Sequence, residues 1–157
     1  METLKEHFKF AEDTFLKDGY LSPMLYIKDE HGNNVVIGLE LQKDSIIKRQ
    51  MFYFAGQKVA KIGLNPDWVV FVTEMWFKNC DKDEVPVGYI SDMPDKKEGL
   101  ICVYQEKTGK STGMIKEIIR DGDKVSLGEE QKGLNNISSG VLDEFWKGYI
   151  KTLKVVL

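Results

Sequence analysis

Helical periodicity marks three segments of the chain. Near its start, charged residues separate apolar residues that lie three or four positions apart, which predicts an amphipathic helix ending at Asp18-Gly19. The apolar positions of this helix are Leu4, Phe8, Ala11 and Phe15. A second helix is predicted after a cap at Asp44 or Ser45. Its core-facing stripe is expected at Ile47, Met51, Ala55, Val59 and Ile62. The clearest helix is the last, with apolar positions at Leu142, Phe145, Trp146, Tyr149, Ile150 and Leu153.

Alternating or unbroken apolar runs mark the strands. Met24 to Ile27 and Val35 to Leu41 flank a polar turn, and together they predict a β-hairpin. The segment 68–77 is apolar on both faces except at Thr73 and Glu74, which predicts a central strand covered on both sides. Three further segments, joined by glycine-containing turns, predict a meander of consecutive strands at Leu100 to Glu106, Gly113 to Arg120 and Lys124 to Leu127.

These elements predict one α+β domain over residues 1–157. We expect the order α-β-β-α-β-β-β-α and a mostly antiparallel sheet of five or six strands with helices packed against it. Acidic residues and prolines interrupt the pattern over residues 78–99, which predicts a long loop or arm unless a short strand lies around Val87 to Ile90. Because long structureless loops are uncommon in compact domains, we interpret this segment as a functional flap or a dimer arm.

Charge and composition narrow the class of protein. The chain has 22 basic and 25 acidic residues with the two signs interspersed, so nucleic acid is not an expected partner. No signal peptide precedes Leu4, and no apolar run approaches the roughly twenty residues that span a bilayer, so we expect a cytoplasmic protein without a membrane partner. Cys80 and Cys102 are isolated, which predicts free thiols, although the sequence leaves a disulfide between them open.

One motif suggests phosphate binding. The segment Thr108 to Thr112 contains the Gly-Lys-Ser of a phosphate-binding loop. That motif requires a glycine five residues before Gly109, where the chain has Tyr104, and a helix after it. A strand is predicted there instead, so a hairpin turn is favoured over nucleotide binding.

Other candidate ligands are also better explained without a bound group. The acidic residues after Cys80 lack the spacing of a metal site, so we favour a solvated loop at Asp81, Asp83 and Glu84. His7 and His31 lack metal-ligand spacing and are interpreted as surface histidines. Cys102 falls inside a strand and is interpreted as a core residue. We therefore expect neither a metal nor a cofactor.

Glu74 is the most unusual residue of the predicted sheet. It shares a strand face with Val72 and Trp76, where a carboxylate loses hydration unless something binds it. Such an acid is a general base with a raised pKa, an anchor for a ligand, or one half of a salt bridge, and the salt bridge is favoured because ion-pair networks also perturb buried acids. Trp76 either stacks on a planar ligand or belongs to the core, and the core interpretation is favoured.

A set of short motifs resembles a known family. The segments, in order, are Phe15-Leu16-x-Asp18-Gly19-x-x-x-Pro23, Thr73-Glu74-Met75-Trp76, Ile119-Arg120-Asp121-Gly122 and Leu127-Gly128. Over roughly residues 10 to 130 the chain looks like an uncharacterised family of small bacterial, archaeal and phage proteins with an Asp-Gly, Pro and Glu-x-Trp pattern. The resemblance implies no activity, cofactor or partner. It singles out the positions that match this pattern, namely Asp18, Gly19, Pro23, Glu74 and Trp76.

Three functional hypotheses follow. The preferred one is a non-catalytic interaction or regulatory protein that binds a protein partner, or a second copy of itself, through its sheet face or the 78–99 arm. The alternative is a small ligand-binding enzyme or hydrolase in which Glu74 is the base or anchor and Trp76 forms a pocket wall, with Asp18 as a further candidate binding residue. Nucleic-acid binding would require lysines to gather on one face despite the acidic total.

Overall fold

The computed structural model describes residues 2–41, 44–77, 93–131 and 140–156. These residues form three helices and six strands. In chain order they are α1 (Glu2–Asp18), β1 (Met24–Asp29), β2 (Asn34–Gly38), α2 (Ser45–Lys61), β3 (Pro66–Phe77), β4 (Lys97–Glu106), β5 (Ser111–Asp121), β6 (Lys124–Glu130) and α3 (Gly140–Val156). The α+β class is therefore confirmed, and the order is α-β-β-α-β-β-β-β-α, one strand more than the predicted string.

The six strands form one antiparallel sheet in the order β2-β1-β3-β4-β5-β6. β3 and β4 lie at its centre, as the apolar run of β3 predicts, and β2 and β6 are its outer strands. β4 begins at Lys97, so the predicted arm at 78–99 was wrong for its last three residues, which pair with β3. Residues 78–92 of that arm, with the suggested strand at 87–90, lie outside the described residues.

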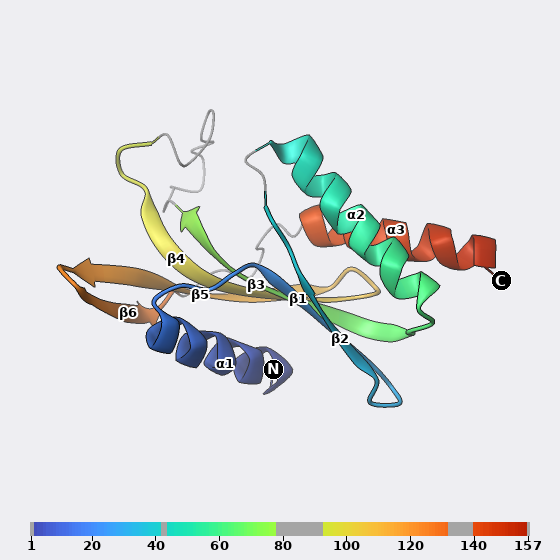
Figure 1. The fold of residues 1–157 in the computed structure, drawn as a ribbon, viewed down its shortest axis with the longest axis horizontal. Coiled ribbons are helices and arrows are strands. Elements are labelled where there is room, and N and C mark those ends of the chain that lie inside the picture. The colour runs from blue at the N-terminus through green and yellow to red at the C-terminus, as the bar shows by residue number, and fades with distance from the viewer. Residues whose placement is uncertain (1, 42–43, 78–92, 132–139, 157) are drawn as a thin grey trace.

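Helices cover both faces of the sheet, α2 and α3 on one side and α1 on the other (Figure 1). Strand side chains alternate between the two faces. The core under α2 and α3 contains Leu25, Ile27, Phe52, Ala55, Val59, Val69, Phe71, Ile101, Val103, Ile115, Leu142, Phe145, Trp146 and Tyr149. The core under α1 contains Leu4, Phe8, Ala11, Phe15, Val70, Val72, Leu100, Cys102, Tyr104 and Ile118. The apolar stripe predicted for α1 is therefore confirmed at all four positions.

α2 and α3 touch through their backbones. A Cβ atom on Gly56 would lie 1.9 Å from the carbonyl oxygen of Phe145, and one on Gly148 would lie 2.1 Å from that of Tyr53. Both values are far below any real carbon–oxygen contact. Only glycine fits at these two crossings, so the sequence allows the helices to approach more closely than side chains would permit.

This crossing changes which face of α2 is buried. Ala55 and Val59 are buried as predicted, but Ile47 and Ile62 are 46% and 54% exposed, and Phe52 is fully buried in their place. The predicted stripe was wrong at Ile47 and Ile62 because α2 packs against two neighbours, the sheet and α3. Its buried face therefore turns toward α3, and a second set of apolar side chains remains in contact with solvent.

Candidate functional site

Glu74 lies on the α1 face of β3, where its carboxylate holds the connector between α1 and β1. Its Oε2 accepts a hydrogen bond from the backbone N–H of Leu21 at 3.1 Å, and its Oε1 lies 3.8 Å from Nη2 of Arg120. The side chain is 28% exposed. Both carboxylate oxygens thus have partners, and Glu74 fastens the chain just before β1 to the central strand.

Arg120 extends this cluster to β4. Its Nε donates a hydrogen bond to Oε2 of Glu98 at 2.7 Å. This hydrogen bond, with a further contribution from the charge of Glu74, raises the pKa of the Arg120 guanidinium above its ordinary value. One cation therefore balances two carboxylates from neighbouring strands. A salt bridge of this kind is the structural interpretation favoured for Glu74 from the sequence.

The other two candidate binding residues named from the sequence are Trp76 and Asp18. Trp76 is on the same face of β3 as Glu74 and is 40% exposed. Nζ of Lys96 stands 4.5 Å from the centre of its ring, an arrangement suited to a cation–π contact. Asp18 is exposed at the last position of α1. Glu74, Trp76 and Asp18 do not line any of three clefts found among the described residues.

One cleft of about 330 Å³ lies between α1 and the β1–β2 hairpin. His7, Tyr26, Val36 and Trp68 are among its lining residues. The ring of His7 lies 5.2 Å from that of Tyr26 and 5.6 Å from that of Trp68. His31 is exposed, as predicted for a surface histidine, whereas His7 is partly buried in this cleft because its flank of α1 faces β1. Burial raises the pKa of Tyr26, and the neighbouring Cys102 adds to the shift.

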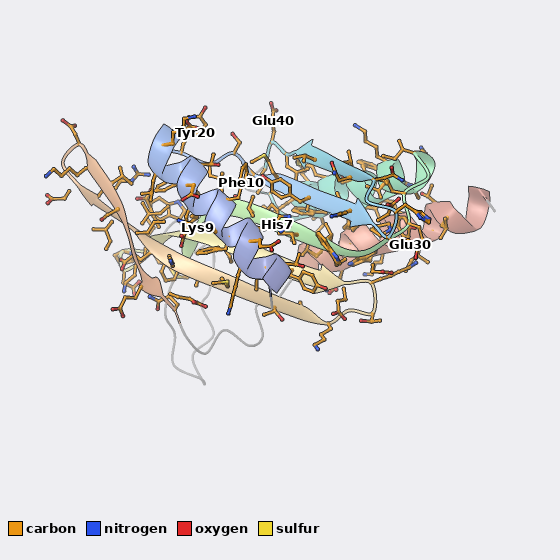
Figure 2. The ribbon with its side chains drawn as sticks, turned by 90° about the horizontal axis from the view of Figure 1, so that it is seen from below. His7, Lys9, Phe10, Tyr20, Glu30 and Glu40 are labelled. Carbon is orange, nitrogen blue, oxygen red and sulfur yellow. The ribbon has the colours of Figure 1, made fainter. Side chains whose placement is uncertain are left out.

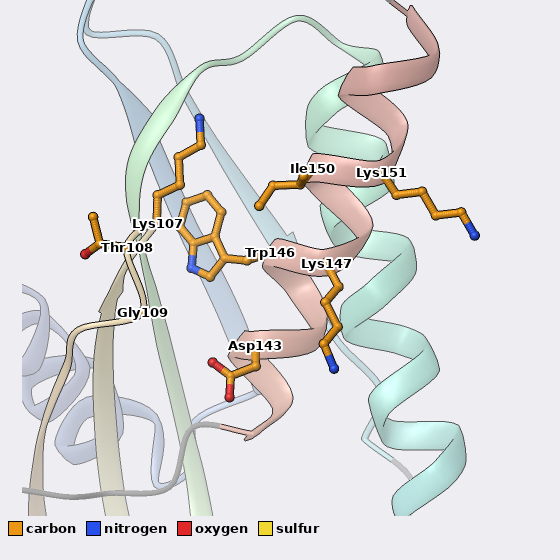
Figure 3. Close-up of a pocket in the computed structure, with 8 residues that line it drawn as sticks. All are labelled: Lys107, Thr108, Gly109, Asp143, Trp146, Lys147, Ile150 and Lys151. Carbon is orange, nitrogen blue, oxygen red and sulfur yellow. The ribbon is translucent and has the colours of Figure 1, made fainter.

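A larger cleft of about 520 Å³ lies between the β4–β5 turn and α3 (Figure 3). Three lysines line it, but they do not converge: Lys151 points away from the buried Trp146, and Lys147 pairs with Glu144 at 3.1 Å. The acid of the cleft, Asp143, accepts a hydrogen bond from Nε2 of Gln105 at 2.7 Å. Its charged groups mostly have partners within the chain, so the cleft lacks the converging charges of a ligand site.

The segment resembling a phosphate-binding loop is the turn beside this cleft. Gly109 has φ +100°, and the N–H of Glu106 donates to the carbonyl of Lys110 at 2.8 Å, closing the β4–β5 hairpin. The hairpin interpretation is confirmed. A third cleft, of about 370 Å³, borders the same turn and is lined by Asp67, Tyr104, Glu106, Lys107 and Thr108.

Cys102 is a buried free thiol in β4, as its position in a strand predicts. Burial raises the pKa of this thiol well above its ordinary value, which suppresses the reactive thiolate. Cys80 and the acidic residues after it lie outside the described residues. Within the described ranges, no group of three or more His, Cys, Asp or Glu side chains is placed to hold a metal ion, and no helix is long and apolar enough to cross a bilayer.

The outer edge of β2 is the feature that the sequence analysis missed. The N–H of Leu39 donates to Pro23 and the N–H of Asp29 donates to the carbonyl of Asn33, both at 2.9 Å, so Asn33 and Leu39 face β1. Hydrogen-bonding direction alternates along an antiparallel strand, and this pairing has no register shift. The backbone N–H and C=O groups of the even-numbered residues between Asn33 and Leu39 therefore point away from β1. These residues are Asn34, Val36 and Gly38. In the described part of the chain, no strand pairs with this edge.

Exposed apolar side chains lie beside this edge on the α1 face of the sheet, and others lie on the side of α2 that faces away from α3. On the α1 face, Val36 is 51% exposed and lies opposite Tyr26, whose ring is 6.3 Å from that of the exposed Phe10. Figure 2 shows α1 lying diagonally across the sheet, with the β1–β2 hairpin beside it rather than beneath it. On the other face, α2 lies on the β1–β2 side and α3 on the β4–β5 side (Figures 1 and 2). Because Gly56 faces α3, the exposed Ile47 and Phe54 lie on the far side of α2.

Comparison with known proteins places the chain in a phage family. Residues 1–156 match the family described as Bacteriophage lambda protein ea47, and the chain belongs to that family. The predicted resemblance to a family of phage proteins is confirmed in so far as the matching family is a phage family. The match covers residues 1–156, more than the 10–130 predicted from the motifs. No curated protein and no solved structure matches the chain.

Proposed function

We propose that this member of the ea47 family is a non-catalytic interaction protein that binds a protein partner through the edge of its sheet. We name its binding surface the β2 surface: the outward backbone groups of Asn34, Val36 and Gly38, with the apolar side chains Phe10, Tyr26 and Val36 on the α1 face and Ile47 and Phe54 on α2. The observation that carries the proposal is an outer strand whose outward hydrogen-bonding groups pair with no strand among the described residues, with exposed apolar side chains beside it on the α1 face.

The sequence of β2 supports a strand that accepts a neighbour. Soluble proteins protect outer strands with charges, prolines or bulges, because an open edge recruits other strands. β2 reads Asn-Val-Val-Ile-Gly, without a charge or a proline, and its pairing with β1 has no bulge. Adding a strand to a sheet edge is an established way of binding a protein segment, with backbone hydrogen bonds for affinity and alternate side chains for specificity.

The exposed apolar area around β2 supports the same proposal. Phe10 is 55% exposed and Phe54 is 59% exposed. Single exposed apolar residues need no explanation, but several around one open edge are typical of an interaction surface. The enzyme alternative lacks comparable support, because both oxygens of Glu74 are engaged by Leu21 and Arg120 and Glu74 lines none of the three clefts.

Photo-crosslinking with a blocked-edge control tests the proposal. Asn34 is replaced by the photo-reactive residue p-benzoyl-phenylalanine, and the adducts formed in the expressing cells are identified by mass spectrometry. We expect an adduct that is lost when Val36→Lys places a charge on the edge. The adduct should persist with Ser126→Lys, which is also an exposed position and lies on the opposite outer strand β6. An adduct pattern that is the same with both lysine variants, or the absence of any adduct, would contradict the proposal.

A further inference from the structure

We infer that the strand that pairs with β2 is the β2 strand of a second copy of this chain, antiparallel to the first and with the twofold axis at Val36. This inference rests on the proposed function, because it names the partner of the β2 surface. The two six-stranded sheets would then continue into one sheet across the axis.

The hydrogen-bonding pattern of β2 suits this pairing. With the axis at Val36, Val36 lies opposite Val36 of the second copy, and Asn34 lies opposite Gly38 of the second copy. These are the three residues whose N–H and C=O groups point outward. Each such pair exchanges two backbone hydrogen bonds, so the pairing forms about six in all. A shift by one residue would instead place the outward-pointing groups of Val36 opposite those of Val35 or Ile37 in the second copy, which point toward their own β1 and cannot pair.

The side chains of β2 are self-complementary in the same register. Val35 of one copy lies opposite Ile37 of the other on the α2 face, where both already pack against the core beneath α2. Val36 meets Val36 of the second copy on the α1 face. Apolar cross-strand pairs stabilise a sheet, whereas like charges directly opposite each other destabilise it. Since β2 carries no charge, self-pairing meets no repulsion within the strand.

The flanks supply the area that five residues of strand cannot. Stable protein interfaces bury about 800 Å² on each partner, more than a short ladder covers. Val36, Tyr26 and Phe10 extend the contact on the α1 face, and Ile47 and Phe54, exposed on the side of α2 away from α3, are available to extend it on the other face. A second copy brings the same side chains to the other side of the axis, so each apolar flank faces its own equivalent.

A cysteine placed on the axis tests the register directly. In the proposed pairing the two Val36 Cα atoms are about 5.5 Å apart, within the range that a disulfide spans. We expect Val36→Cys, in a Cys80→Ser background with the buried Cys102 retained, to form a covalent dimer under mild oxidation. Asn34→Cys is the matched control, because its equivalent lies four residues along the strand, roughly 13 Å away, and is out of reach. Ser126→Cys on β6 reports pairing through the opposite edge.

Analytical ultracentrifugation of the unmodified chain completes the test. We expect a dimer that Val36→Lys converts to a monomer while circular dichroism shows an unchanged fold, and covalent dimer formation at least about tenfold faster for Val36→Cys than for either control. A monomer at all concentrations, or fastest crosslinking through Ser126→Cys, would overturn the inference. A monomer whose photo-adduct at position 34 contains a different protein would overturn the second copy but keep the proposed function. If the chain without the Val36→Lys change is a monomer and also forms no photo-adduct at position 34, both the inference and the proposed function are overturned.

Discussion

The two outer strands of the sheet are built differently. β2 has no charged residue, whereas β6 carries Lys124, Glu129 and Glu130. The strand beside β6 adds ion pairs, from Arg120 to Glu98 and from Lys116 to Glu12. Charges on an outer strand oppose the addition of another strand, because a new neighbour would have to desolvate them. The two outer strands therefore differ in charge, and the difference favours strand addition at β2 over β6, as the proposed function requires.

The largest effect on stability is expected from disturbing the packing of α2, the helix on the face of the sheet opposite α1. Gly56→Ala would push a methyl group into the Phe145 carbonyl and separate α2 from α3, at a cost of about 3 kcal/mol in the free energy of unfolding. Gly128→Ala on β6 is the matched control: its added carbon meets nothing closer than 3.5 Å, so a change below about 1 kcal/mol is expected. Urea unfolding measures both. Equal losses of stability in Gly56→Ala and Gly128→Ala would show that the close contact between α2 and α3 contributes no special stability.

The next effect concerns the turn that presents β2. Oδ1 of Asp29 accepts hydrogen bonds from the N–H groups of His31 and Asn33 at 3.0 and 2.9 Å, and Oδ2 accepts one from the Asn33 side chain at 3.2 Å. Asp29→Ala removes all three, and we expect a loss of about 1–2 kcal/mol together with faster amide exchange along β2. Asp123→Ala in the exposed β5–β6 turn should change the stability far less. Unchanged exchange in β2 would mean that the turn does not hold the outer strand.

A smaller effect should follow from acid alone. Burial raises the pKa of Asp29, but the hydrogen bonds from Asn33 and His31 outweigh it, and the net pKa is lowered. A lowered folded-state pKa adds stability that is fully present above the ordinary pKa of 3.8 and is lost as the pH falls through the folded-state pKa. Lowering the pH from 5 to 3 should therefore loosen the β1–β2 hairpin before the β5–β6 hairpin. Hydrogen exchange measured at each pH should show this as earlier loss of protection in β1 and β2. Asp29→Asn should remove this difference, and a persistent difference would assign it to other groups.

The smallest effect is expected on the charged side of the sheet. Glu74→Gln keeps an acceptor for the Leu21 N–H but loses the partner charge of Arg120, and exposed ion pairs contribute at most about 1 kcal/mol. We expect a loss of a few tenths of a kcal/mol in thermal unfolding and an unchanged dimer in ultracentrifugation. A dimer that dissociates in this variant would move the interface away from β2. A hydrolytic activity that disappears with it would favour the enzyme alternative.

The buried face of a helix was predictable from the spacing of its apolar residues where the helix packs against one neighbouring element. Among the described elements α1 packs mainly on the sheet, so its spacing at Leu4, Phe8, Ala11 and Phe15 identifies the buried face. α2 contacts the sheet and α3, and its spacing therefore predicted Ile47 and Ile62 as core where the structure buries Phe52. Period alone cannot show which of two apolar sides is covered, because that depends on the glycine crossing with α3.

The site was predictable only in part for a similar reason. The unusual position of Glu74 within β3 was evident, but its partners Leu21 and Arg120 lie 53 and 46 residues away, and only the fold brings them together. The β2 surface was missed because strand order, which makes β2 an outer strand, is not contained in a hairpin pattern. The available signal was the absence of any charge from Asn34 to Gly38, a feature that distinguishes β2 from β6.

The position of α1 has a consequence for folding during synthesis. α1 is the earliest helix of the chain, yet its apolar side packs on β3, β4 and β5, whose last residue is Asp121. At roughly 5–20 residues per second, the ribosome makes the rest of this core several seconds after α1. During that interval Phe8 and Phe15 lack part of the sheet that buries them. A nascent chain arrested before β5 should therefore bind a chaperone that the completed chain releases.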